Sequence, residues 1–308
     1  MHLLVPFASD DSEACRHVLR DLSLPHLARL LARLTASGRD EGEASSLSPT
    51  HERALAAARG WRGGDGALPF AAHALRADGI DPGDTAWGLV TPAHWLLGRD
   101  HVAMTDPAQL ALSDAESNAF FAAVRGLFES EGFVATWGAA QRWYIGRDDL
   151  QGFATASLDR VIGRSVDGWL GTDRSDLGQL LRRVQSEVQL VFHAHPLNEA
   201  REERDEAVVN SFWLSGCGRA QAADPADEPQ VDASLRTPLL AGDWAAWAEA
   251  WQALDAGPIA RALEAEEATL TLCGEKSAAR FERVRQGLLQ RLHRRWTRLE
   301  PHAVLESL

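Results

Sequence analysis

The chain contains both short apolar segments typical of strands and longer amphipathic segments typical of helices, and the two kinds do not alternate regularly. This order along the chain limits the possible folds more than any other feature of the sequence. Residues 86–104 read as two strands joined by a turn at 98–100, whereas residues 113–128 carry apolar side chains at helical spacing. A regular strand–helix repeat would predict a parallel sheet. The irregular order predicts instead an α+β fold, a mixed β-sheet flanked by helices, with a mainly helical C-terminal segment.

Several start signals place individual elements. Residues 3–7 predict a buried strand, and helices are expected from Ser12 and from Pro25, which suits a first helical turn. Ser113 and Glu116 form a capping-box pattern, and Ser175 is expected to cap a longer helix. The remaining expectations are a loop over residues 37–50, a hairpin over 132–147, a strand over 208–218, a strand over 269–275, and a final helix from about Ser277.

Three segments follow from these patterns. Residues 1–85 form an N-terminal strand and helical segment, residues 86–218 a central domain, and residues 235–308 a helical segment that packs on the core. The run 219–234 is rich in Ala, Asp and Pro, which is typical of a linker or a long surface loop.

Charge and cysteine usage narrow the class of protein. The formal net charge of −13 disfavours proteins that coat nucleic acid or an anionic membrane, because both need clustered positive charge. Cys15, Cys217 and Cys273 are far apart and odd in number, which is a poor disulfide framework. The N-terminus lacks a signal-peptide pattern and no apolar run is long enough to span a bilayer, so we expect a cytoplasmic protein.

Two short motifs carry the chemistry in the central segment. Residues 159–164 read D-R-x-x-G-R, and residues 195–201 read H-P-x-N-x-x-R, followed by an Asn in a strand and then G-x-G at 216–218. Arginine forks bind phosphate and carboxylate in a bidentate manner, so these motifs suit an acidic ligand. The candidate ligand-binding residues are Asp159, Arg160, Arg164, His195, Asn198, Arg201 and Asn210.

Both motifs, in this order, resemble those in the substrate domain of archaeal-type cofactor-independent phosphoglycerate mutases. The whole chain, including P-x-H-W at 92–95, looks similar to bacterial proteins labelled phosphoglycerate mutase-like or regulator of pathogenicity factors type E. The resemblance covers about residues 86–218. It implies that Asp159 and Arg160 contact a phosphorylated small acid, with Arg164 and Arg201 as further candidates.

The departures from the mutase pattern bear on activity. Those enzymes need two metal ions held by Asp and His residues, a Ser or Thr nucleophile, and an opening D-G-x-G-D motif. This chain opens with HLLVPFASDDSE, and Leu214 and Ser215 stand where an arginine usually precedes G-x-G. We therefore expect no catalytic residues, no metal and no other cofactor. The interpretation is a substrate-domain scaffold without the two-metal chemistry.

Each candidate also has a structural interpretation. Asp159, Arg160 and Arg164 could hold a turn by ion pairs, and Asn198, Arg201 and Asn210 could brace a helix end against a strand. A zinc site or a nucleophilic pair built from His94, His193, His195 or Cys217 lacks the required ligand spacing.

The eleven tryptophans should mostly pack in cores, with one or two lining a cleft. Trp244, Trp247 and Trp251 recur at helical spacing and predict a buried face or a docking surface for a protein partner, of which we favour the buried face. Residues 280–298 are rich in arginine and could engage an acidic partner, although a solvated face is the simpler interpretation.

Three functions are compatible with these patterns. We favour a binding or regulatory protein that keeps a phosphoglycerate-mutase-like substrate domain. The alternatives are an active phosphotransferase or mutase with unrecognised catalytic residues, and an interaction subunit of a nucleic-acid-processing complex. Membrane association and direct nucleic-acid binding are not expected.

Overall fold

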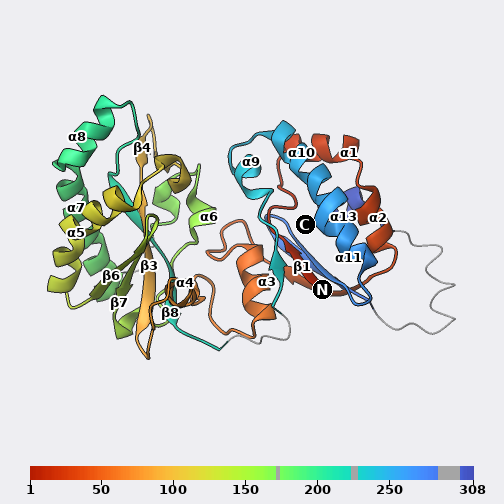
Figure 1. Cartoon of the computed structure of the whole chain (residues 1–308), viewed down its shortest axis with the longest axis horizontal. Coiled ribbons are helices and arrows are strands. Elements are labelled where there is room, and N and C mark those ends of the chain that lie inside the picture. The colour runs from red at the N-terminus through yellow and green to blue at the C-terminus, as the bar shows by residue number, and fades with distance from the viewer. Residues whose placement is uncertain (171–173, 223–227, 284–298) are drawn as a thin grey trace. The chain divides into compact units, whose positions relative to one another are not determined.

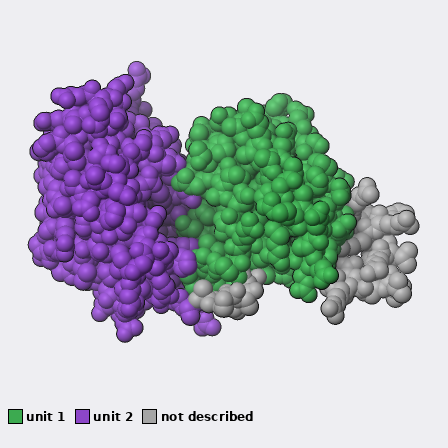
Figure 2. Space-filling model, in the orientation of Figure 1, with its two compact units in different colours: residues 1–45, 49–61, 223–308 green, residues 46–48, 62–222 purple. Residues whose placement is uncertain are grey.

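The computed structural model describes residues 1–170, 174–222, 228–283 and 299–308. The chain forms two compact units (Figure 2). Unit 1 comprises residues 1–45, 49–61 and 223–308, and unit 2 comprises residues 46–48 and 62–222. Both units combine β-sheet with helices, which confirms the α+β class. The first 45 residues therefore belong with the C-terminal segment, whereas the expected ranges separated 1–85 from 235–308.

Unit 1 is built on a five-stranded mixed sheet in the order β2-β11-β10-β1-β9. The central strand pair β1 and β10 is parallel, β9 is parallel to β1, and the other pairs are antiparallel. The strands are β1 (His2–Val5), β2 (Thr35–Glu41), β9 (Gln230–Val231), β10 (Thr269–Cys273) and β11 (Ser277–Glu282).

Helices from both ends of the chain surround this sheet. They are α1 (Glu13–Asp21), α2 (Pro25–Leu31), α3 (Thr50–Ala58), α9 (Arg236–Leu240), α10 (Trp244–Leu254), the π-helical turn η5 (Asp255–Ile259), α11 (Ala260–Glu264) and α13 (Pro301–Glu306). Ser12 and Pro25 begin α1 and α2 as expected. The leucines of α2 and the residues around it, Leu27, Leu30, Leu31 and Leu34, are all buried in the unit 1 core.

The tryptophan stripe of α10 packs inside unit 1. Trp247 and Trp251 are fully buried, and their rings meet edge to face at 6.1 Å. The Trp247 indole N–H donates to the carbonyl of Phe7 at 3.1 Å, which satisfies its polar edge. Trp244 is half-buried against the same core. The stripe is therefore a core face of unit 1.

Two expectations about unit 1 are wrong. Residues 37–41 belong to β2 and not to a loop, because this polar edge strand is held by backbone pairing with β11 and not by a buried face. Residues 277–282 form strand β11 and not the start of a helix, because β11 pairs with β10 across a tight turn and buries Phe281. The rest of the expected final helix, 284–298, lies outside the described residues.

Unit 2 contains a four-stranded antiparallel sheet in the order β6-β7-β3-β8 and a separate hairpin of β4 and β5. The strands are β3 (Ala86–Ala93), β4 (Trp95–Leu97), β5 (Val102–Met104), β6 (Val134–Ala139), β7 (Arg142–Gly146) and β8 (Ser211–Arg219). The expected hairpin at 132–147 is confirmed. The expected pair of strands over 86–104 is confirmed only for residues 95–104, because β3 ends at Ala93 and pairs with β7 and β8 in the larger sheet.

Helices cover both faces of the unit 2 sheet. Trp143 and Ile145 of β7 join one core with α5 (Asp114–Ser130) and α7 (Asp176–His193). Tyr144 joins a second core with α4 (Phe70–Ala77), as strand alternation requires. The shorter elements are the 3-10 turns η1 (Pro107–Leu110), η2 (Asp148–Leu150) and η3 (Val166–Gly168), and the helices α6 (Leu158–Val161) and α8 (Pro196–Glu203).

None of the helices in the described ranges has the length and apolarity needed to cross a lipid bilayer.

Candidate functional site

Asn198 ties the end of α7 to the beginning of β8. Its amide group donates to the carbonyls of Phe192 and Val209, both at 2.7 Å, and its side-chain oxygen accepts from the Val209 N–H at 2.9 Å. The residue is 6% exposed, so each of these bonds also satisfies a buried group. Both amide protons of Asn198 are thus used within the protein.

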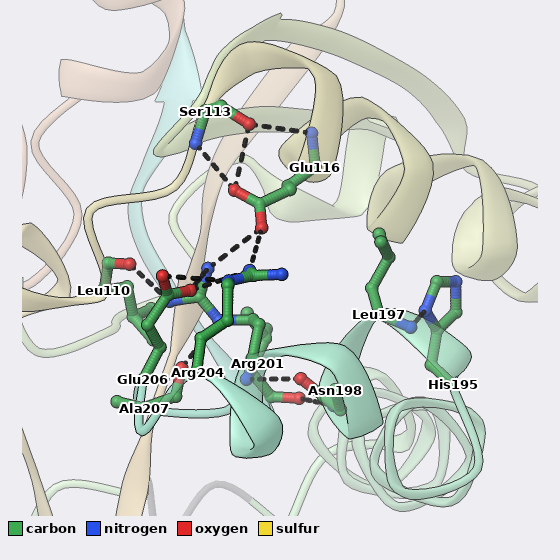
Figure 3. Close-up of polar contacts among 11 residues, drawn as sticks. Leu110, Ser113, Glu116, His195, Leu197, Asn198, Arg201, Arg204, Glu206 and Ala207 are labelled. Carbon is green, nitrogen blue, oxygen red and sulfur yellow. Dashed lines mark hydrogen bonds and ion pairs between the residues drawn. The ribbon is translucent and has the colours of Figure 1, made fainter.

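Arg201 is buried at the centre of a second set of polar contacts (Figure 3). Its guanidinium donates to the carbonyls of Ala207 and Leu110 and lies 3.3 Å from the Glu116 carboxylate. The carboxylate of Glu206 lies 3.4 Å away. The arginine of the H-P-x-N-x-x-R motif therefore joins α8 to the beginning of α5 and to the loop before β8.

Glu116 connects this cluster to the capping box of α5. One carboxylate oxygen accepts from the Ser113 N–H and hydroxyl, and the other accepts from Arg201 and Arg204. Burial would raise the pKa of Glu116, but the Ser113 bonds and the two guanidinium charges outweigh it and lower that pKa. The predicted capping box is confirmed, and its Glu116 also forms ion pairs with Arg201 and Arg204.

His195 is the N-cap residue of α8, where its Nδ1 accepts from the Leu197 N–H at 3.2 Å. Its ring packs against Phe120 with centroids 4.7 Å apart. Burial lowers the pKa of His195 below its usual value, which favours the neutral ring. A neutral ring is also the form that can accept the backbone N–H at Nδ1.

His195 should make the stability of unit 2 depend on pH. The unfolded chain binds the proton more readily, so stability should fall as pH drops below about 6.5, the usual histidine value, and level off below the folded-state pKa. His195→Asn keeps a capping oxygen and should remove this part of the pH dependence. The measurement is urea unfolding between about pH 7.5 and pH 5. His193→Asn, on the exposed end of α7, is the matched control, and an equal effect of both substitutions would contradict the assignment.

Asn210 fixes the beginning of β4. Its side-chain oxygen accepts from the Trp95 N–H at 2.7 Å, and its amide donates to the Trp95 carbonyl at 2.8 Å. Trp95 in turn lies 6.4 Å from Trp213 of β8, measured between ring centroids. The side-chain amide of Asn210 thus bonds to both main-chain groups of Trp95, as a residue of a neighbouring strand would.

The D-R-x-x-G-R segment lies beside the β4–β5 hairpin. The Gly163 N–H donates to the Met104 carbonyl at 2.8 Å, and Ile162 forms a bridge with the same residue. Asp159 and Arg160 belong to α6, and Arg160 is 3% exposed. The contacts described for this segment are with β5, whereas those of Arg201 are with η1, α5 and the loop before β8. His195, Asn198 and Arg201 lie around α8, whereas Asn210 bonds to Trp95 of β4, and Trp95 pairs with Met104, the residue that holds this segment.

A cavity of about 80 Å³ opens next to the α6 segment. Its walls are residues 153–156, the pair Trp169 and Leu170, one face of α7 and residues 212–214 of β8. The Trp213 indole N–H donates to the Ala156 carbonyl at 2.9 Å, so its ring presents an apolar surface. Arg182 is the one charged residue among the described residues that line this cavity.

No motif in the sequence marks this cavity as a site. Two of its tryptophans, Trp169 and Trp213, match the expectation that one or two tryptophans line a cleft. Leu181, Arg182 and Gln185 of α7 carried no motif, and only helical spacing places them on one side.

No cysteine is poised as a nucleophile. All three are buried free thiols, and burial raises the pKa of Cys15 to about 11 and that of Cys217 to about 12. The Nδ1–H of His94 donates to the Val208 carbonyl at 2.8 Å, so the main chain fixes the orientation of the ring. Across the described residues, no group of three or more His, Cys, Asp or Glu side chains is placed to hold a metal ion.

Comparison with known proteins found no matching family model and no matching curated protein. Among solved structures, the chain is similar to the PH0037 protein from Pyrococcus horikoshii, with 14% identity, a TM-score of 0.48 and coverage of 93% of this chain and 88% of that chain. It is also similar to a cofactor-independent phosphoglycerate mutase from Thermoplasma acidophilum, with 12% identity, a TM-score of 0.38 and coverage of 100% and 98%. Both TM-scores lie below 0.5, so neither likeness carries a conclusion about this chain.

Proposed function

We propose that this chain is a binding or regulatory protein and that the cavity beside α6 in unit 2 receives its ligand. The observation that carries the proposal is the position of the D-R-x-x-G-R segment. Residues 153–156 and the pair Trp169 and Leu170 form two walls of the cavity, and residues 157–168, which include the motif at 159–164, connect these walls along the chain. A ligand in the cavity would therefore contact the chain on both sides of the segment that carries Asp159, Arg160 and Arg164.

The lining favours a small acid with a compact apolar part. Phe153, Trp169, Leu181 and Trp213 offer apolar and aromatic surface, which suits a ring or a short branched chain. Arg182 of α7 adds a guanidinium, which suits a carboxylate or phosphate end. Gln185, whose amide also donates to the Phe212 carbonyl at 2.9 Å, adds a second polar group. Because a bare glycerate has no apolar part, we extend the expected phosphorylated acid to aryl and branched-chain acids and their phosphates.

Three of the predicted ligand-binding residues take no part in this proposed site. The side chains of Asn198, Arg201 and Asn210 already bond to main-chain or carboxylate groups of unit 2, so recruiting them would break those bonds. Their ligand-binding role therefore stays a prediction of the resemblance alone.

Filling the cavity should abolish ligand binding. Ala154 lines the cavity and is itself exposed, so Ala154→Phe can place a ring over the opening without disturbing a core. A thermal-shift screen of phosphorylated three-carbon acids, sugar phosphates, nucleotides and aryl acids, with and without manganese, identifies the ligand. Isothermal titration should then give affinity for the wild type and a loss of at least about tenfold for Ala154→Phe.

Ala154→Ser is the matched control and should bind like the wild type. Equal binding by Ala154→Phe would place the ligand elsewhere and contradict the proposal. A manganese-dependent mutase turnover of about 1 s⁻¹ that survives repurification would favour the enzymatic alternative instead.

A further inference from the structure

Unit 1 contains a larger and more polar hollow of about 300 Å³. It lies at the end of α2, beside α11 and the loop that follows α11, and α2 and α11 pack against each other (Figure 1). Arg283, the residue after β11, completes the wall. The polar side chains of this basic pocket are His26, Arg29, Arg33, Glu264, Glu266 and Arg283.

Two of the arginines are held by main-chain carbonyls. Arg33 donates to the Leu263 carbonyl at 3.0 Å, and Arg283 donates to the Glu266 carbonyl at 2.6 Å. Carbonyls orient a guanidinium but do not neutralise its charge, and each uses one of its five donors. Both groups are thus fixed at the pocket wall, and each guanidinium keeps donors that bond to none of the described residues.

Arg29 adds a third positive charge. It lies in the last turn of α2 and is exposed, and it forms no hydrogen bond or ion pair with any of the described residues. His26 stands one turn earlier, where its Nδ1 lies 2.9 Å from the Asp255 carboxylate. Asp255 is 3% exposed and also accepts from the N–H groups of His26 and Leu27, so it holds the His26 ring in place.

The acidic residues of the pocket set a lower limit on the charge of a ligand. Glu264 and Glu266 are exposed and oppose three arginines, so the wall has a small positive excess before any contribution from His26. A monoanion would gain little there. A group with two or more negative charges can contact several guanidinium forks at once, which phosphate and pyrophosphate do through bidentate bonds.

We propose that this pocket binds a phosphate-bearing small molecule, with Arg29, Arg33 and Arg283 as the phosphate ligands. The concave shape and a volume of about 300 Å³ suit a small molecule, and this volume is at the lower end of ordinary ligand sites. The site lies in unit 1 and shares no residue with the cavity proposed in unit 2. Either proposal can therefore be contradicted by experiment without affecting the other.

The test is isothermal titration of the full chain with sodium pyrophosphate and with inorganic phosphate, against sodium chloride of equal ionic strength. Pyrophosphate should bind saturably, one per chain, and more tightly than phosphate. Arg29→Gln should weaken the affinity for pyrophosphate about tenfold, because losing one charge-assisted hydrogen bond weakens binding by about that factor. The melting temperature should not change, since Arg29 has no partner among the described residues to lose.

Arg20→Gln is the matched control, because Arg20 is also an exposed arginine in the last turn of a unit 1 helix but lies outside the pocket. It should keep the wild-type affinity. Three results would overturn the proposal: no saturable binding up to about 10 mM pyrophosphate, equal affinity of wild type and Arg29→Gln, or equal weakening by both substitutions. Tighter binding of a short single-stranded oligonucleotide than of pyrophosphate would also overturn it.

Discussion

Replacing Arg201 by methionine should lower the free energy of unfolding of unit 2 by about 3 kcal/mol. Arg201 is 2% exposed, and its guanidinium bonds to the carbonyls of Ala207 and Leu110 and to the carboxylate of Glu116. Methionine fills similar space but leaves these buried acceptors without their donors. Urea unfolding followed by far-UV circular dichroism at neutral pH measures the change.

Arg204→Met is the matched control, because Arg204 pairs with the same two carboxylates. Arg204 lies 2.9 Å from Glu116 and 2.8 Å from Glu206, but its side chain is 46% exposed. Solvent screening makes such a pair weak, so the midpoint of unfolding should hardly move. Equal effects of the two substitutions would contradict the structural role of Arg201. If Arg201→Met were as stable as the wild type but no longer bound a phosphorylated acid, this result would support the ligand-binding role that the resemblance implies.

The motif around α8 shows how far sequence can predict a site. The pattern H-P-x-N-x-x-R correctly singled out residues with unusual constraints, since Asn198 and Arg201 are buried polar groups with several partners. A buried brace and a ligand-binding residue impose the same kind of constraint on sequence. Only the positions of the Val209 and Ala207 main-chain groups, which carry no side-chain signal, separate the two interpretations.

Elements with a local signal were predictable. The stripe through Phe120, Val124 and Phe128 and the cap at Ser113 define α5 without any tertiary information. The same holds for α7, whose cap is Ser175. In these segments the pattern, the cap and the buried face agree.

Elements that depend on distant partners were not predictable. Strand β2 has the sequence TASGRDE, and its residues are exposed or half-buried, so no apolar alternation marks it. It exists because β11 lies alongside, and the sequence of β11 does not itself mark a strand, since the expectation there is a helix from about Ser277. Pairing between segments more than 230 residues apart leaves no signal in either one, as the bond from Ser37 to Arg280 illustrates.

Truncating the chain after Arg219 should abolish unit 1. The deletion removes β9, β10 and β11, so β1 loses both of its neighbours in the sheet and β2 loses its partner. It also removes Trp247 and Trp251, which would leave several hundred Å² of apolar surface exposed in the remaining part of the unit 1 core. The 1–219 fragment should therefore aggregate, and size-exclusion chromatography with light scattering measures this directly.

The single substitution Trp247→Ala in the full chain tests the same packing without the deletion. Because Trp247 is fully buried, its loss should lower the free energy of unfolding of unit 1 by about 3–5 kcal/mol. Trp244→Ala, at a half-buried position of the same helix, should cost clearly less. A docking face would behave in the opposite way, since removing it leaves the fold intact and costs only partner binding. A soluble 1–219 fragment with an unchanged melting transition would therefore overturn internal packing and favour the interaction-subunit hypothesis.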